Sequence, residues 1–116
     1  MATREEHFYQ ALEHFASGQL DAAIAAYRQA LALDPSYTDA LHGLAEALAQ
    51  KGKVDEAIGV AHRITEIDPD DVLARTSLSR LYLRKGMKKE AEEEAAKARV
   101  LGWKQQLRQQ KQQDDS

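Results

Sequence analysis

The sequence repeats itself every 34 residues, and no other feature restricts its possible folds so strongly. The residues that recur at this interval are Gly18, Gly52 and Gly86; Ala23, Ala57 and Ala91; Leu33, Ile67 and Leu101; and Pro35 and Pro69. Several residue types that recur in one register indicate copies of a single structural unit. Such units bury their apolar faces by stacking on one another, so we expect a short array of repeats.

Each copy has the composition of a helical hairpin. The chain contains 20 alanines and 13 leucines but only 2 prolines and 2 phenylalanines, which favours helices over strands. Each repeated glycine follows a helical stretch that needs a left-handed residue to end it, and each Asp-Pro pair stops the next helix. We therefore predict six helices in three antiparallel pairs, over residues 3–16, 20–33, 37–50, 54–67, 71–84 and 88–101.

This pattern resembles the tetratricopeptide repeat family over roughly residues 4–103. The positions that carry the resemblance are the small residue and the closing proline of the second helix, which are Ala23, Ala57, Ala91, Pro35 and Pro69 here. The resemblance implies an all-α fold in which helix-turn-helix units stack as a right-handed solenoid. The units would be residues 4–37, 38–71 and 72–103, and their first helices would line a concave groove.

The first helix departs from the family pattern. Its apolar stripe of Phe8, Ala11, Leu12 and Phe15 lies one residue beyond the expected slots, or about 100° around the helix. Either this helix is rolled so that the rings face the core, or the rings line the concave face. The sequence leaves both arrangements open.

The last repeat carries charge where earlier repeats carry apolar residues. The stripe changes from Leu20, Ile24 and Leu31 in the first copy to Lys88, Glu92 and Arg99 in the third. A terminal repeat that faces water needs such a change, so we expect the array to end after three copies.

A polar, glutamine-rich segment, residues 104–116, follows the repeats. Trp103 and Leu107 are spaced one helical turn apart and offer the apolar contacts in this region. We expect the segment to form either a short capping helix that these two side chains pin, or a frayed extension of the last helix. Alternatively, the segment pairs with another chain.

No arrangement of catalytic or metal-binding residues stands out. The chain has no cysteine, and its glycines are scattered singly rather than gathered in a phosphate-binding loop. His7 and His14 share a helix face but lie two turns, about 10 Å, apart, which is too far for one tetrahedral metal. Asp68, Asp70 and Asp71 supply fewer oxygens than calcium needs, and we interpret Asp70 as the N-cap of the next helix. We therefore predict a protein that is not an enzyme and needs no cofactor or metal.

Charge is distributed unevenly along the chain. Residues 4–37 have a net charge of −3, residues 38–71 of −5 and residues 72–105 of +5. These charges either solvate helix faces, or they orient a bound segment or favour head-to-tail contact between copies. The overall charge of −3, the lack of long apolar runs and the polar N-terminus favour a cytoplasmic protein that binds neither nucleic acid nor membrane.

The resemblance also implies a binding surface, because family members usually bind a partner segment in the concave groove. The corresponding residues here are Phe8, Tyr9, Leu12, Asp39, His42, Glu46, Leu73, Thr76, Ser77, Arg80 and Arg84. One subclass of the family grips the C-terminal carboxylate of chaperones with lysine, asparagine and arginine side chains. Those slots hold Phe8, Leu12, Gly43, Leu73 and Ser77 here, so we expect no ligand of that class.

The sequence thus predicts a scaffold or adaptor that binds a protein or peptide partner. Arg80 and Arg84 offer cations and Phe8 and Leu12 offer apolar contacts, so we expect an apolar segment with an acidic flank. The alternative function is self-assembly into a homo-oligomer, in which the apolar stripe of the first repeat contacts the basic end of another copy.

Overall fold

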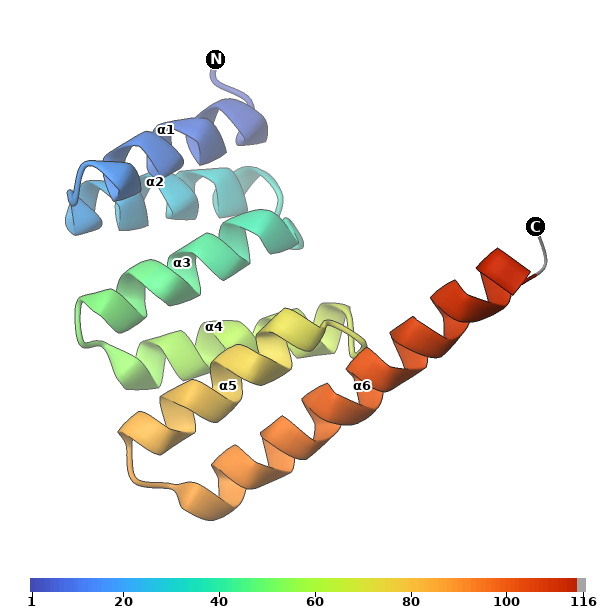
Figure 1. The fold of residues 1–116 in the computed structure, drawn as a ribbon. Helices are drawn as coiled ribbons and strands as arrows, with labels where there is room; N and C mark the ends of the chain where they lie inside the picture. Colours follow the sequence, from blue (N-terminus) through green and yellow to red (C-terminus); the bar gives the residue numbers. More distant parts are fainter. Residues whose placement is uncertain (115–116) are drawn as a thin grey trace.

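The computed structural model describes residues 1–114, and these residues form six α-helices and no strand. The helices are α1 (Arg4–Ala16), α2 (Leu20–Leu33), α3 (Thr38–Gln50), α4 (Val54–Ile67), α5 (Val72–Arg84) and α6 (Lys88–Asp114). Each packs mainly on its neighbours in the sequence, so that the three pairs follow one another down a stack (Figure 1). The predicted all-α repeat fold is therefore confirmed. In this part of the chain, no helix combines the length and the apolar character that crossing a membrane requires.

Most helix ends lie within one residue of the predicted positions. Gly18, Gly52 and Gly86 have φ angles of 76°, 87° and 77°, in the left-handed region that ends α1, α3 and α5. The predicted N-cap of α5 is wrong by one residue. Asp71, rather than Asp70, accepts a hydrogen bond from the backbone N–H of Ala74 at 2.9 Å. The N–H of Asp70 is itself bonded to the Asp68 carboxylate, which fixes the turn before the helix.

The core runs through the stack and combines small and large side chains. The repeated alanines Ala23, Ala57 and Ala91 are almost completely buried, which lets neighbouring helices approach closely. The largest fully buried side chains are Tyr27, Leu41, Leu48, Ile64 and Leu78. One connected cluster of buried side chains reaches from Ala11 on α1 to Leu81 on α5, so the core is continuous across the repeat boundaries.

The first helix turns its two phenylalanine rings toward the core. The ring of Phe8 lies 6.1 Å from that of Tyr27 and 5.4 Å from that of Tyr37, measured between centroids. Phe15 is also partly buried against the core, whereas Leu12 is 41% exposed. The rolled arrangement of α1 is thus correct for both rings and wrong for Leu12.

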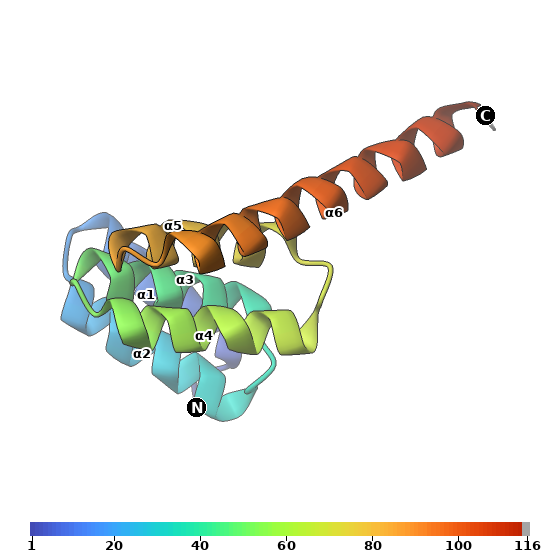
Figure 2. The same ribbon diagram turned by 90° about the horizontal axis from the view of Figure 1, so that it is seen from below.

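The segment after the third repeat is an extension of α6. The prediction of a capping helix pinned by Trp103 and Leu107 is wrong, because these side chains are 66% and 51% exposed. Position 103 holds tryptophan where the earlier repeats hold the proline that stops the helix, so α6 continues to Asp114. Its last turns project away from the other helices (Figures 1 and 2). Residues 115 and 116 of the predicted segment 104–116 lie outside the described residues.

Candidate partner-binding groove

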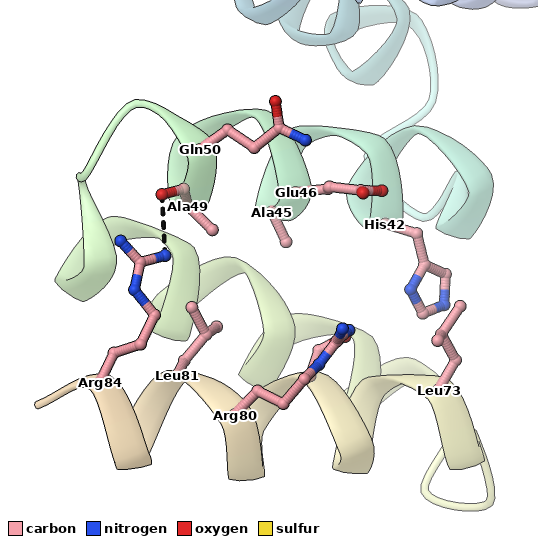
Figure 3. Close-up of a pocket in the computed structure, with 10 residues that line it drawn as sticks. His42, Ala45, Glu46, Ala49, Gln50, Leu73, Arg80, Leu81 and Arg84 are labelled. Atoms are coloured by element: carbon pink, nitrogen blue, oxygen red, sulfur yellow. Dashed lines mark hydrogen bonds between the residues drawn. The ribbon is translucent and has the colours of Figure 1, made fainter. Parts of the chain in front are cut away.

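A cavity of about 280 Å³, which we call the groove, lies between α3 and α5. Its walls are side chains that project from the two helices on opposite sides (Figure 3). The residues that line it are His42, Ala45, Glu46, Ala49, Gln50, Leu73, Ser77, Arg80, Leu81 and Arg84. The predicted binding residues in this set are His42, Glu46, Leu73, Ser77, Arg80 and Arg84.

One end of the groove is fixed by a contact between repeats. The imidazole Nε2 of His42 on α3 donates a hydrogen bond of 2.8 Å to the carboxylate of Asp71, and both side chains are mostly buried. Because Asp71 also caps α5, this contact ties the start of α5 to the middle of α3. The spacing of the two groove walls is therefore set by side chains as well as by helix packing.

At the other end of the groove, Arg84 reaches from α5 to α3. Its guanidinium donates a hydrogen bond of 2.9 Å to the backbone carbonyl of Ala49, in the last turn of α3 (Figure 3). The same carbonyl also accepts a hydrogen bond of 3.0 Å from the backbone N–H of Gly52, and the last carbonyls of a helix favour a nearby cation. This contact holds Arg84 in place at the rim.

Two opposite charges lie between these ends without neutralising one another. Glu46 on α3 and Arg80 on α5 are both exposed, and neither forms an ion pair or hydrogen bond within residues 1–114. Burial, and to a smaller extent the Glu46 carboxylate, raises the pKa of Tyr27. Ala45, Leu73 and Leu81 supply apolar surface alongside these charges. The groove therefore offers an anionic group, a cationic group and an apolar floor.

The other predicted binding residues lie outside this cavity. Tyr9 and Leu12 are exposed on α1, and Phe8 packs toward the core instead. Asp39 is exposed in the first turn of α3, and Thr76 donates its hydroxyl to the carbonyl of Val72 within α5. Four cavity residues are absent from the predicted set given above: Ala45, Ala49, Gln50 and Leu81. The four-residue spacing of the two alanines is a signal for a shared helix face that the sequence did contain.

Two further histidines, His14 and His62, contact polar side chains of neighbouring residues. His14 Nδ1 lies 2.9 Å from the side-chain oxygen of Gln19, and His62 Nε2 lies 2.8 Å from the hydroxyl of Tyr82. Burial is the main cause that raises the pKa of Tyr82. Within the described residues, no three side chains of histidine, aspartate or glutamate come together to form a metal site.

Comparison with solved structures places the whole arrangement among known repeat proteins. A MamA crystal structure matches with a TM-score of 0.87 and 28% identity over 89% of this chain. YrrB, described as a repeat protein with an unusual peptide-binding site, matches with a TM-score of 0.82 and 24% identity over 87% of the chain. The chain spans 60% of the MamA chain and 52% of the YrrB chain.

A shorter domain gives a similar match. The second repeat domain of Spaghetti (RPAP3), solved with an HSP90 peptide, has a TM-score of 0.80 and 18% identity, with coverage of 85% of this chain and 92% of that one. No curated protein matches the sequence. A family model for the tetratricopeptide repeat matches residues 14–76, which is more than half of the chain. With the repeated glycines at the helix ends and the repeated alanines in the core, this match shows that the chain belongs to the tetratricopeptide repeat family.

Proposed function

We propose that this chain is a non-enzymatic scaffold that binds a segment of a partner protein in the groove between α3 and α5. The observation that carries the proposal is the pair of opposite charges, Glu46 and Arg80, which face the groove without partners among residues 1–114. Both side chains are hydrated in the free protein, and Arg80 can exchange its water for a carboxylate of a ligand, which forms the stronger, charge-assisted kind of hydrogen bond. Peptide binding by YrrB and by the RPAP3 domain supports a role of this kind.

The charges of the groove restrict the ligand. An apolar side chain would pack on Ala45, Leu73 and Leu81, and a carboxylate beside it would accept hydrogen bonds from Arg80. Arg84 is already bonded to the Ala49 carbonyl, so it would contribute mainly its charge. We therefore propose an apolar segment with an acidic flank as the ligand of this adaptor.

Reversing the charge of both arginines should weaken binding at least tenfold, or by about 1.4 kcal/mol. The probe is a set of peptides selected from a random displayed library against the immobilised wild-type protein. Their affinity is then measured by fluorescence anisotropy for the wild type and for Arg80→Glu/Arg84→Glu. The loss is expected because an acidic flank would meet two carboxylates in place of two cations.

The matched control is Lys88→Glu/Lys89→Glu, which changes the net charge by the same amount at exposed positions of α6. This control should bind the selected peptides with almost wild-type affinity. Equal affinity of both double variants for the peptides would remove Arg80 and Arg84 from the binding site.

A further inference from the structure

The exposed end of α6, residues 100–114, has one face whose chemistry changes along its length; we call this segment the α6 tail. Val100, Trp103, Leu107, Lys111 and Asp114 are spaced by three or four residues, so they lie along one side of the helix. The first three are 49%, 66% and 51% exposed. From its start to its end, this face is therefore apolar, then cationic, then anionic.

The first helices of the three repeats present the complementary order. Leu12, Glu46 and Arg80 occupy the same repeat position, 34 residues apart, on α1, α3 and α5. All three are exposed, and Tyr9 adds a second exposed apolar side chain on α1. From the first repeat to the third, this row is apolar, then acidic, then basic.

The two surfaces also agree in length. A helix rises about 1.5 Å per residue, so Trp103 and Asp114 lie about 16 Å apart along the axis of α6. The first helices of successive repeats touch only marginally, and a helix with its side chains is about 10–12 Å wide, so the row from α1 to α5 spans about 20 Å. The long side chains of Lys111 and Arg80 make up the remaining few ångströms, so the apolar, charged and oppositely charged parts of the tail can meet their counterparts at the same time.

A tail is poorly placed to pair with another tail or with its own groove. Within the α6 tail, the three cations Lys104, Arg108 and Lys111 outnumber the one acid, Asp114, so two tails side by side would repel each other. The helix is unbroken to Asp114 and points away from the rest of the chain (Figures 1 and 2). It would have to unfold to turn back onto its own α3 and α5.

We propose that the α6 tail of one copy docks on the row of first helices in a second copy. This inference rests on the proposed function, because the tail would occupy the same groove. The contacts would be Trp103 and Leu107 with Leu12 and Tyr9, Lys111 with Glu46, and Asp114 with Arg80. Each copy then offers one tail and one groove, so the contact is head-to-tail and can continue from copy to copy. It would also cover the exposed tryptophan.

A complementation experiment tests this contact with the full-length chain. The tail variant is Trp103→Ala/Leu107→Ala and the groove variant is Glu46→Lys/Arg80→Glu. By light scattering on a sizing column, the mass of the wild type should rise above 13.0 kDa with concentration, and each variant alone should stay at 13.0 kDa. An equimolar mixture should form one-to-one complexes, because one variant still supplies a groove and the other a tail.

A charge exchange checks the register of the contact. Lys111→Glu and Glu46→Lys should each weaken assembly at least tenfold, since each places like charges together. The double variant Lys111→Glu/Glu46→Lys should assemble like the wild type, because the ion pair forms again with its charges exchanged.

Three results would overturn the inference. They are a wild type that stays monomeric at every concentration, a mixture of variants that stays monomeric, and a tail variant that still assembles. A monomeric wild type that binds vesicles of phosphatidylcholine and phosphatidylserine through Trp103 and Leu107 would assign the tail to a membrane surface instead. A wild type that binds the library-selected peptides and stays monomeric at every concentration would end this inference and leave the proposed function standing. A tail variant that fails to bind these peptides, although its groove is intact, would count against the proposed function itself.

Discussion

Gly43→Ala should lower the free energy of unfolding by about 1–3 kcal/mol, whereas Gly59→Ala should raise it by up to about 1 kcal/mol. Both glycines lie inside helices of the second repeat, α3 and α4, where alanine is intrinsically favoured. They differ in their surroundings. A Cβ atom on Gly43 would lie 2.3 Å from Cζ of the Tyr27 ring, but one on Gly59 would meet no atom within 4 Å.

The Tyr27 ring has little room to move away from a new methyl group. It is 1% exposed and packs beside the ring of Phe8. Urea denaturation of the wild type and of both variants at one pH measures the two effects. In a Tyr27→Leu background, Gly43→Ala should lose most of its cost, because the clashing atoms are gone. Equal stability of Gly43→Ala and Gly59→Ala would show that the Tyr27 ring can make room for a side chain at position 43.

Arg75→Ala should destabilise the fold by about 2–3 kcal/mol, because it would leave a buried carboxylate without its main partner. The guanidinium of Arg75 on α5 donates a hydrogen bond of 3.1 Å to Glu94 on α6. Glu94 is only 6% exposed, so its carboxylate depends on Arg75 and Lys97 rather than on bulk water. Lys97 lies 3.3 Å from the other carboxylate oxygen and keeps the loss below that of an isolated buried charge.

Replacing both partners should restore most of the stability. Arg75→Met/Glu94→Leu fills the same space with apolar groups and removes the need to bury charges, so it should come close to the wild type. A double-mutant cycle by urea denaturation, made of the wild type, Arg75→Met, Glu94→Leu and the double variant, gives the coupling between the two residues. An Arg75→Ala variant that is as stable as the wild type would show that this ion pair does not stabilise the packing of the third repeat.

The helix ends could be predicted from the sequence because local residues determine them. Gly18, Gly52 and Gly86 end helices through their own backbone conformation, whatever packs against them. The ion pair of Arg75 and Glu94 could not be found in this way, since it depends on which faces of α5 and α6 meet. Arginine in a slot that holds Leu41 in the second repeat looks, in sequence, like a loss of the core pattern.

The candidate site could be predicted in part, because the repeat register can also be found from the sequence alone. The 34-residue register places Glu46 and Arg80 at equivalent positions, and both line the groove. It does not give the rotation of a helix about its axis, which decides that Phe8 faces the core and Tyr9 faces outward. The length of α6 follows from the missing proline at position 103, but the many glutamines of this segment are equally compatible with a frayed end.

The most direct test of the proposed groove is to map a bound ligand onto the chain by nuclear magnetic resonance. A peptide selected from the displayed library is titrated into the isotope-labelled protein, and the backbone amide shifts are followed. We expect the largest changes on α3 and α5, at Ala45, Glu46, Ala49, Ser77 and Arg80. Changes confined to α2, α4 and the start of α6, with these amides unmoved, would contradict a binding site between α3 and α5.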